Sequence, residues 1–555
     1  MLDSSSQLPP CDLDPAAFER AMDAITRIVG SDHVKRSPAN LEAAGRATVP
    51  EPRLPAAVVY PGTAEDVSAV VRVAGEHRIA LWACSKGKNW GYGSATAVSG
   101  NTVILHLERL DRIIEVNEEL AYAVVEPGVT YRQLKRYLQD HHPTLWCDCT
   151  DGPPDGSIIG NALDRGVGVT HYSDHFGSLC GLDVVLANGE RVRTGGGPID
   201  CKTWHTHKWG VGPYLEGMFS QSNYGVVVKA GVWLMPRPEA FCSFQFDLRE
   251  ESDLPSLVDT VRRLMLDGTL QAASHIVNDI VALAILTQYP APLLDRYSRL
   301  PDTFVDEMRE RYGVYAWSFG GGIQGTPAVV RVVKRTLKRR LAPLGRIVFL
   351  DDRIVGVARA VTRLAQVPMM RGPIEWMVRR FAGKSLEMLA VAPYAYSVLQ
   401  GTPSDFFVRH AYFKSRIPKP EVADPDRDNC GLIWFAPIAP MTGRDIRAIL
   451  EMCRPLFERY RFDFYAALLT QNARSMIVLM AIFFLKEDAE QVARASELYE
   501  ALSRATSEAG YQPYRISVTG MSKLADMAPD FSALTRCIKA ALDPDHVLAP
   551  GKYGI

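Results

Sequence analysis

The sequence has little of what marks membrane-embedded, secreted or nucleic-acid-binding proteins. Its longest apolar run, Met476 to Leu485, is ten residues long and too short to cross a bilayer, so we expect a buried strand there. Lys and Arg number 62 against 63 Asp and Glu, and the resulting net charge of −1 favours neither a nucleic-acid partner nor an anionic membrane surface. Met1 to Ser6 lack the positive region and apolar core of a secretory signal.

Cysteine is also scarce and unpatterned. Ten cysteines are scattered through 555 residues without a repeated spacing, which indicates reduced thiols in a cytoplasmic enzyme rather than a disulfide framework. Cys201, His205 and His207 could be drawn as metal ligands, but no fourth ligand lies near them in the sequence. We therefore expect no metal site and a small substrate.

The length and the local patterns predict two domains. The first 240 residues alternate short strands and helices, as in an α+β or α/β domain. From Phe241 longer helices and β-branched strands follow, which predicts a sheet backed by helices on one side. We expect a first domain at 1–240, a second domain at 241–510, and a return to the first domain at 511–555.

Individual elements follow from periodicity, caps and turn residues. Thr63 with Asp66 resembles a capping box, and Asn188-Gly189 indicates a hairpin between two strands. Helices are expected at 15–29, 131–139, 253–266, 328–341, 445–460, 488–509 and 531–542, and strands at 103–107, 113–116, 228–234, 432–438, 462–470 and 476–485.

Two glycine-containing stretches stand out. Cys84 to Gly93 holds three glycines and two lysines, a composition that lets backbone N–H groups and positive charge meet a phosphate-bearing cofactor. Its spacing fits neither the Walker nor the dinucleotide fingerprint, and a surface turn is the alternative. The second stretch runs from Asp148 to Gly168, and its first part, Asp148 to Asn161, places three acids among glycines and prolines, which suits a solvated loop or backbone close to something flat.

Four separated motifs resemble the FAD domain of the vanillyl-alcohol oxidase and p-cresol methylhydroxylase flavoproteins, with the closest likeness to vanillyl-alcohol and eugenol oxidases. The C-terminal segments Ala540 to Pro544 and Leu548 to Ile555 match as well. The likeness covers nearly the whole chain and is weakest from Phe241 to Val422. The four motifs are Ser85 to Gly93, Glu126 to Tyr131, Gly160 to Gly168 and Phe219 to Gly225.

The resemblance implies an α+β, two-domain FAD-binding fold of the vanillyl-alcohol oxidase type, with a sheet-and-helix cap domain over the isoalloxazine. It also implies oxidation of a para-substituted phenol. A hydride would leave the carbon para to the hydroxyl for flavin N5, and the resulting quinone methide would take up water or lose a proton.

The residues that the resemblance assigns to this chemistry are present. Tyr92, Tyr514 and Arg515 match the family's phenolate site, where a guanidinium and two phenol groups stabilise the substrate anion. Asp151 matches the acid that handles a proton near N5. The loop Gly152 to Asp155 is one residue longer than in the family, so Asp155 stays an alternative to Asp151.

The resemblance also implies a set of cofactor-binding residues. They are Ser85, Lys86, Gly87, Lys88, Asn89, Gly91, Gly128, Ser157, Gly160, Asn161, Arg165, Gly168, Tyr172, His175, Asn223, Gly225, Val227 and Lys552.

Two departures from the family affect the cofactor and the substrate. Leu432 stands where the oxidases carry the histidine that bonds to the flavin, so FAD is predicted to be non-covalent unless His410 or Tyr412 makes the bond. The family's Glu-Met-His-His run is replaced by Ala473 to Met476, which predicts altered cap-side substrate contacts.

The oxidant and the exact chemistry stay open at this point. Dioxygen or an electron-acceptor protein would reoxidise the flavin, and a homo-oligomer fits a family whose members are often dimers or larger. The alternatives are a biosynthetic flavoenzyme that uses the same chemistry for cyclisation or coupling of a larger phenol, and a flavin-binding protein without turnover.

The substitution at Leu432 gives the first testable prediction. Because leucine cannot form the covalent bond, acid precipitation should leave a colourless pellet and release all the flavin into the supernatant. Absorbance of both fractions near the flavin maximum measures this. A yellow pellet would show a covalent link through another residue.

Overall fold

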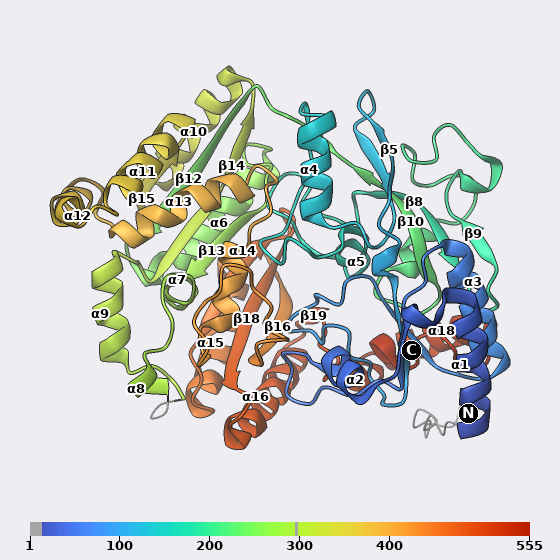
Figure 1. Cartoon of the computed structure of the whole chain (residues 1–555). Helices are drawn as coiled ribbons and strands as arrows, with labels where there is room; N and C mark the ends of the chain where they lie inside the picture. Colours follow the sequence, from blue (N-terminus) through green and yellow to red (C-terminus); the bar gives the residue numbers. More distant parts are fainter. Residues whose placement is uncertain (1–13, 295–297) are drawn as a thin grey trace.

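Strands fall into two groups that lie side by side in Figure 1. The structure, a computed structural model, describes residues 14–294 and 298–555, so the expectation about Met1 to Ser6 falls outside the described residues. The first group, blue to green, comes from the N-terminal part of the chain. The second, green to orange-red, comes from the part after residue 240.

The first group consists of a four-stranded sheet, a five-stranded antiparallel sheet and a two-stranded ribbon. In spatial order the strands of the four-stranded sheet are β1 (Val34–Lys35), β2 (Ala57–Val59), β4 (Val103–His106) and β3 (Leu81–Cys84). Those of the five-stranded sheet are β5 (Ile113–Asn117), β6 (Tyr122–Val125), β10 (Val226–Trp233), β8 (Leu179–Val185) and β9 (Arg191–Arg193), and the ribbon pairs β7 (Leu145–Trp146) with β11 (Met235–Pro236).

The second group is one eight-stranded sheet. Its strands in spatial order are β15 (Gly345–Leu350), β12 (Ala240–Leu248), β14 (Trp317–Gly325), β13 (Ser274–Asn278), β17 (Tyr465–Thr470), β18 (Ser475–Leu485), β16 (Cys430–Pro440) and β19 (Pro513–Arg515).

The helices of eight or more residues match the sequence-based expectations closely where those were made. They are α1 (Pro15–Val29), α2 (Pro38–Gly45), α3 (Ala64–Glu76), α4 (Tyr131–His141), α6 (Leu254–Leu266), α7 (Asp279–Leu286), α9 (Asp302–Tyr312), α10 (Pro327–Leu341), α11 (Asp352–Leu364), α12 (Pro368–Ala382), α13 (Leu386–Val398), α15 (Gly443–Arg459), α16 (Ala489–Glu508) and α18 (Pro529–Leu542). The shorter ones are α5 (Ile158–Leu163), α8 (Ala291–Leu294), α14 (Asp405–Val408) and α17 (Leu524–Met527).

Local chemistry explains why the N-terminal elements form. The expected capping box is present: the Thr63 hydroxyl accepts a bond from the Asp66 N–H at 3.0 Å, and the Asp66 carboxylate accepts one from the Thr63 N–H at 3.2 Å. The hairpin at Asn188-Gly189 is also present between β8 and β9, with Gly189 at φ +78°. Helices α1 and α3 then bury their apolar faces against each other and the four-stranded sheet.

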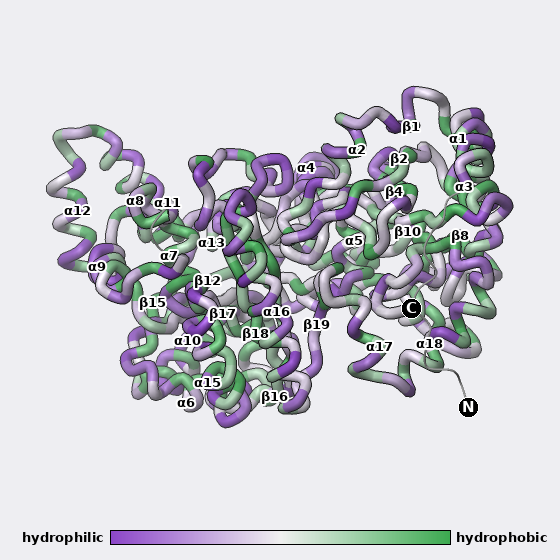
Figure 2. The backbone as a smooth tube through the Cα atoms, turned by 90° about the horizontal axis from the view of Figure 1, so that it is seen from below, coloured by the Kyte–Doolittle hydropathy of each residue, from purple (hydrophilic) through white to green (hydrophobic). Residues whose placement is uncertain are grey.

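The eight-stranded sheet has helices on both faces, which corrects the expectation of helices on one side. Ile433 and Phe435 of β16 point toward α6, α10, α15 and α16. Leu432 and the partly buried Trp434, on the same strand, point the opposite way toward α7 and α9. Alternation along a strand places neighbouring residues on opposite faces, and both faces are apolar here, so each needs a covering layer. Figure 2 shows this apolar interior as green segments beneath purple surface stretches.

The C-terminal segment joins both groups of strands. Strand β19 pairs with β16 at the edge of the eight-stranded sheet, and Leu548 then bridges to Leu81 of the four-stranded sheet. The side chain of Lys539 is 0% exposed, and its Nζ lies 2.6 Å from the Asp543 carboxylate and 2.8 Å from the Asn223 carbonyl oxygen. The units at 1–240, 241–510 and 511–555 stay a proposal, because the last of them contributes β19 to the eight-stranded sheet and Leu548 to a bridge with the four-stranded sheet.

A short acidic segment also ties the two halves together. Asp424 lies 2.9 Å from Lys88 Nζ, and Asp426 accepts bonds from Trp90 Nε1 at 3.0 Å and Ser94 Oγ at 2.9 Å. Burial, with a smaller contribution from the charge of Asp424, raises the pKa of Asp426 to about 7 against the opposing effects of Ser94, Lys88 and Trp90. Because of these contacts, the glycine-rich segment is held by the second half of the chain.

No helix in the described parts of the chain is long and apolar enough to cross a membrane. The described cysteines are free thiols, as the scattered spacing predicted.

The buried Lys539–Asp543 pair predicts a large effect on stability. Lys539→Met leaves Asp543 buried without its cation and should lower the free energy of unfolding by about 3–5 kcal/mol, measured by guanidinium denaturation. Lys523→Met removes the exposed pair with Glu500 and should cost under about 1 kcal/mol. Equal losses in both variants would contradict the structural role of Lys539.

Asp426 predicts a pH-dependent contribution to stability. Its folded-state pKa of about 7 lies above the ordinary value of 3.8, so its contribution is full below pH 4 and is lost as pH rises toward 7. The unfolding free energy of the wild type minus that of Asp426→Asn should therefore fall across this window. Urea denaturation at each pH measures the difference. A flat difference would show that Asp426 titrates normally.

Candidate active site

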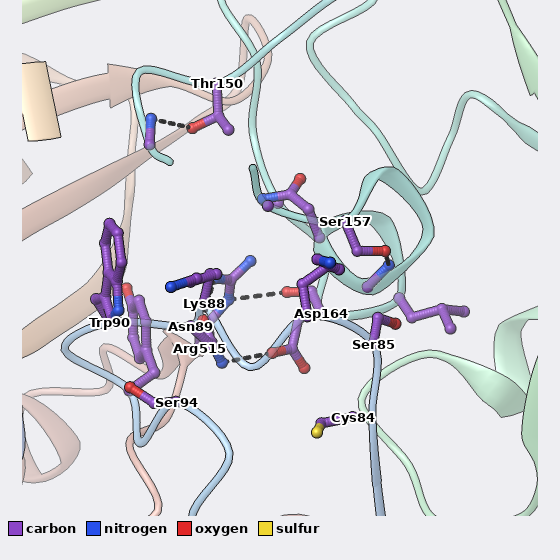
Figure 3. A pocket seen from close by; sticks show the side chains of 18 of the residues that line it. Cys84, Ser85, Lys88, Asn89, Trp90, Ser94, Thr150, Ser157, Asp164 and Arg515 are labelled. Atoms are coloured by element: carbon purple, nitrogen blue, oxygen red, sulfur yellow. Dashed lines mark hydrogen bonds between the residues drawn. The ribbon is translucent and has the colours of Figure 1, made fainter. Parts of the chain in front are cut away.

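A cavity of about 330 Å³ lies between the two halves and is lined by both. Its volume is within the range of small-molecule sites. On one side lie the glycine-rich segment after β3 and the start of α5, and on the other lie residues of β13, β16, β17 and β18 (Figure 3). The cavity therefore sits where the sequence motifs converge.

The glycine-rich segment lines the cavity from Cys84 to Trp90. Its two lysines are already paired: Lys86 Nζ lies 3.5 Å from Glu108, and Lys88 bonds to Asp424. The positive charge that the sequence predicted for phosphate binding is thus partly neutralised.

The start of α5 forms the facing wall. The Ser157 hydroxyl caps the helix by accepting a bond from the Gly160 N–H at 2.8 Å and donates to the Pro127 carbonyl at 2.6 Å. Asn161 follows on the same helix, and Ser157, Gly160 and Asn161 all line the cavity. Small residues and a helix start give the close backbone approach that a flat cofactor requires.

The structure brings most of the sequence-predicted residues together. Those that line the cavity are Asp151, Tyr92, Tyr514, Arg515, Ser85, Lys86, Gly87, Lys88, Asn89, Ser157, Gly160, Asn161, Gly225, Val227 and Lys552. The predicted residues outside its lining are Gly91, Gly128, Arg165, Gly168, Tyr172, His175 and Asn223.

Two of the outlying glycines have packing roles instead. A Cβ on Gly91, which has φ +77°, would lie 2.2 Å from Trp434 Cδ1, and one on Gly128 would lie 2.5 Å from the Glu108 carbonyl oxygen. Both positions need glycine because another segment approaches too closely for a side chain. Both lie outside the lining of the cavity, and their assignment to the cofactor stays a prediction.

The other outlying residues support the wall from behind. Asn223 donates to the carbonyls of Ala549 and Ile555 and so holds the C-terminal segment. The His175 ring is 2.6 Å from the Asn161 side-chain oxygen and 3.4 Å from the Asp148 carboxylate.

The remaining three predicted residues, Arg165, Gly168 and Tyr172, also lie behind the cavity wall. Arg165 Nε donates to Ser220 Oγ at 2.8 Å, and a Cβ on Gly168 would meet Asp148. Tyr172 lines a small separate hollow beside His175.

Arg515 organises one end of the cavity. Its guanidinium donates from Nε to the Asp164 carbonyl at 2.9 Å and from Nη1 to the Asn89 side-chain oxygen at 3.3 Å (Figure 3). The guanidinium carbon lies 4.9 Å from the centre of the Tyr92 ring and 5.4 Å from that of Tyr514. Within the described residues its buried Nη2 has no hydrogen-bond partner, so one donor is left for a ligand.

The electrostatics of this end favour a bound anion. Burial works against the charge of Arg515, but Tyr514, Asp164 and Tyr92 outweigh it and raise its pKa, so the guanidinium stays protonated. Burial raises the pKa of Tyr92 and of Tyr514 despite the opposing charge of Arg515. Both tyrosines therefore remain neutral hydroxyl groups beside a fixed positive charge.

Asp151 lies in the cavity near two histidines of the second half of the chain. Asp151, His275 and His410 all line the cavity, and the charge of Asp151 acts on both imidazoles. Burial lowers the pKa of His275, and it lowers that of His410 to about 4, so both are neutral near pH 7. Asp155 instead bonds to Arg132 outside the cavity, which favours Asp151 over Asp155.

The residues considered for a covalent flavin link lie in the second half of the chain. Leu432 and His410 line the cavity. Tyr412 is fully buried, and its hydroxyl donates to Asp428 at 2.6 Å and accepts from the Asp424 N–H at 2.8 Å. Tyr412 lies outside the lining and is already bonded, so it is poorly placed to make that link.

Sequence reasoning missed several cap-side residues. His275, Trp434, Leu469, Ile477 and Leu479 line the cavity and carried no motif. The two-residue spacing of Leu432 and Trp434 along one strand was the available signal, because it places both on one face. Which face of the sheet meets the cofactor was not readable from this pattern.

The described residues offer no set of side chains that could together bind a metal ion. The part of the chain that the structure describes contains no group of three His, Cys, Asp or Glu side chains placed to hold an ion. His205 Nδ1 lies 2.9 Å from the Cys180 carbonyl oxygen instead.

The cavity does fit FAD on structural grounds. The small residues at the start of α5 leave room for a flat ring system, and the buried, unfilled Nη2 of Arg515 marks a place for an oxygen anion next to it. The residues that would hold the cofactor are those of the glycine-rich segment, the start of α5, and Gly225 and Val227 at the start of β10.

Comparisons with known proteins agree with this geometry. Residues 55–195 match the model of the FAD binding domain family. The chain is 35% identical over 539 residues to 1'-carboxy-chondrochloren decarboxylase of Chondromyces crocatus, with 97% of each protein covered. It is 29% identical over 563 residues to the 4-cresol dehydrogenase (hydroxylating) flavoprotein subunit of Pseudomonas putida, covering 100% of this chain and 99% of that one.

Solved structures give the same result. The crystal structure of p-cresol methylhydroxylase with substrate bound matches with a TM-score of 0.86 at 28% identity, and 98% of each chain is covered. The two-domain α+β FAD-binding architecture expected from the motifs is thereby confirmed. The chain belongs to the vanillyl-alcohol oxidase and p-cresol methylhydroxylase family and is an FAD-dependent oxidoreductase.

Proposed function

We propose that the protein oxidises a para-substituted phenol at the carbon para to the hydroxyl, by hydride transfer to flavin N5 through a quinone methide. The observation that carries this proposal is the buried guanidinium of Arg515, which keeps one nitrogen without a partner in the described structure while it lies against two tyrosine rings. A phenolate oxygen is the ligand that this arrangement fits best. When bound, FAD would supply the acceptor for the hydride.

Arg515, Tyr92 and Tyr514 would bind the substrate as its anion. A guanidinium in a water-poor cavity lowers the pKa of a bound phenol, and the anion pushes electron density into the ring, which weakens the para C–H bond. Asn89 and the Asp164 carbonyl fix the guanidinium plane, so its remaining nitrogen is aimed without further reorganisation.

Asp151 would handle the proton. A carboxylate on the cap side can take a proton from water as the water adds to the quinone methide, or accept the proton that the product loses. The neutral imidazoles of His275 and His410 can donate or accept hydrogen bonds with the para side chain. The altered segment Ala473 to Met476 supports a substrate that differs from those of other members.

A decarboxylating reaction is the second candidate. The relative at 35% identity is named a decarboxylase, and its identity exceeds the 29% of the cresol dehydrogenase subunit. If the carbon next to the oxidised one carried a carboxylate, breaking that C–C bond would release CO₂. The electron pair would form a C=C bond and restore the phenolate, so the quinone methide would need no water.

Several finer points remain proposals. We propose non-covalent FAD, supported by Leu432 in the cavity and by the bonded state of Tyr412. Dioxygen or an acceptor protein would complete turnover, and a cytoplasmic location stays a prediction. Membership in a family of oxidoreductases argues against a flavin-binding protein without turnover.

The role of Arg515 predicts a large kinetic effect. Arg515→Ala should slow anaerobic flavin reduction by 4-alkylphenols, 4-hydroxybenzyl alcohols or allylphenols by about 10²–10³-fold, because the phenolate loses its cation. Stopped-flow absorbance of the flavin-loaded enzyme measures the rate. Arg444→Ala, which removes an exposed arginine of α15, serves as the control and should leave it unchanged.

Contradicting results would be plain in the same experiment. Unchanged reduction in Arg515→Ala, at normal flavin content, would remove Arg515 from the chemistry. Release of CO₂ from a phenol with a carboxylate next to the benzylic carbon, in step with flavin reduction, would favour the decarboxylating reaction. Reduction without CO₂ release would favour simple oxidation.

A further inference from the structure

A buried group of polar side chains lies behind the cavity wall and takes no part in the reaction proposed above. Its members are Asp148, His175, Asn161 and Tyr131. Asp148, His175 and Tyr131 are only 5%, 7% and 3% exposed. Asn161 and Tyr131 also line the cavity, whereas the other two lie outside its lining. The group therefore meets the cavity only through Asn161 and Tyr131.

The His175 ring fixes the orientation of the Asn161 amide. His175 Nδ1 lies 2.6 Å from Asn161 Oδ1, and the Tyr131 hydroxyl donates to the same oxygen at 3.1 Å. A carbonyl oxygen can only accept, so Nδ1 carries the proton in this bond. The amide keeps two N–H donors, which have no partner within the described residues. These donors are left for a ligand in the cavity that Asn161 lines.

Asp148 holds the other side of the same ring. His175 Nε2 lies 3.4 Å from Asp148 Oδ2, and neither buried atom has another hydrogen-bond partner among the described residues. The second carboxylate oxygen, Oδ1, accepts bonds from the N–H groups of Cys149 at 2.8 Å and Val169 at 3.3 Å. These backbone bonds fix the carboxylate, and the fixed carboxylate in turn limits rotation of the imidazole.

Two glycines of one sequence motif leave the space that this group occupies. A Cβ on Gly166 would lie 1.9 Å from Asn161 Oδ1. A Cβ on Gly168 would lie 1.9 Å from Asp148 Oδ2 and 2.4 Å from His175 Nε2. Neither glycine has a positive φ, so the backbone conformation does not require glycine at either position. The need for glycine comes from the buried polar group, which any side chain would displace.

The group lies near the end of the cavity that Arg515 organises. Asn161 precedes by three residues Asp164, whose carbonyl accepts the bond from Arg515 Nε (Figure 3). Burial raises the pKa of Tyr131 well above its ordinary value, and the charge of Arg515 opposes this, so Tyr131 is within range of the guanidinium. Hydride transfer requires contact between the substrate and the isoalloxazine. A donor at this end would therefore face the ring rather than the phosphates of FAD, an assignment that rests on the proposed function.

We propose that Asp148 and His175 are positioning residues that hold the Asn161 amide as a hydrogen-bond donor to the isoalloxazine. The ring gains negative charge when it accepts a hydride, and a fixed N–H donor stabilises that charge. Asn161 contacts the ring, and Asp148 and His175 act through Asn161. The three residues together raise the reduction potential of the bound flavin.

The first test is the reduction potential of the flavin-loaded protein, measured by equilibration with a reference dye in the absence of any phenol. His175→Gln keeps an N–H near the Nε2 position for Asp148 but removes the N–H donated to Asn161. His175→Asn keeps an N–H near the Nδ1 position instead. We expect His175→Gln and Asn161→Ala each to lower the equilibrium constant for flavin reduction by about 3–10-fold, the effect of one hydrogen bond. His175→Asn should keep the wild-type value.

A double variant tests whether His175 acts through Asn161. Asn161→Ala with His175→Gln should show no larger change than Asn161→Ala alone, because the bond between the two is already lost. Gly168→Ala displaces the buried pair and should lower the equilibrium constant as His175→Gln does. The matched control is Gly217→Ala, whose Cβ would meet only Tyr214, at 3.9 Å, and it should leave the constant unchanged. Flavin content and thermal melting show that each variant is folded.

Three results would overturn the inference. They are a wild-type potential in His175→Gln at full flavin content, additive changes in the double variant, and equal potentials in Gly168→Ala and Gly217→Ala. A weaker affinity of Asn161→Ala for FAD without a change in potential would place Asn161 against another part of the cofactor and would equally refute it. Because no phenol is present, a protein that shows the expected potentials but oxidises no phenol would refute the proposed function alone.

Discussion

A positive charge kept out of water, with part of its hydrogen-bonding capacity unused, is the constraint on which the active site depends. Several segments that are distant in the sequence hold this charge, the guanidinium of Arg515, in place. Asp164, whose backbone carbonyl receives Arg515, also accepts side-chain bonds from Asn89 at 2.8 Å and from Tyr553 at 3.1 Å. The glycine-rich segment, the end of α5 and the C-terminus therefore meet around one guanidinium. Displacing any of them would change the direction in which its free nitrogen points.

Much of the fold was readable from local chemistry. Helix α1 begins and ends at Pro15 and Val29 as predicted, because Asp14 and Pro15 mark its start and Gly30 its end. The capping box at Thr63 and the hairpin at Gly189 were also found, since each is set by residues within a few positions of one another. The motifs for the cavity were predictable because backbone that approaches a flat cofactor tolerates few residue types.

Properties that depend on distant segments were not readable. The motifs did not reveal that Trp434 and the Glu108 carbonyl, from segments distant in the sequence, leave no room for a side chain at Gly91 and Gly128. The lysines of the glycine-rich segment were expected to offer positive charge to a phosphate, and the sequence did not show that Lys88 bonds to Asp424, 336 residues away. The covering of the eight-stranded sheet on both faces could not be inferred either, because alternation tells which residues share a face but not what covers it.

The pairing of β19 with β16 has a consequence for substrate length. Arg515 lies opposite Ala436 in the register, and Ala436, Trp434 and Leu432 alternate along the same side of β16. Arg515 and part of the cavity wall are thus built on adjoining strands of one sheet. The distance between Arg515 and these wall residues is therefore set by the spacing of the paired strands. A relative movement of the two halves of the chain would not change it. A larger ligand between Arg515 and this sheet would therefore require smaller side chains at positions such as Leu469 or Ile477, rather than a wider opening between the two halves.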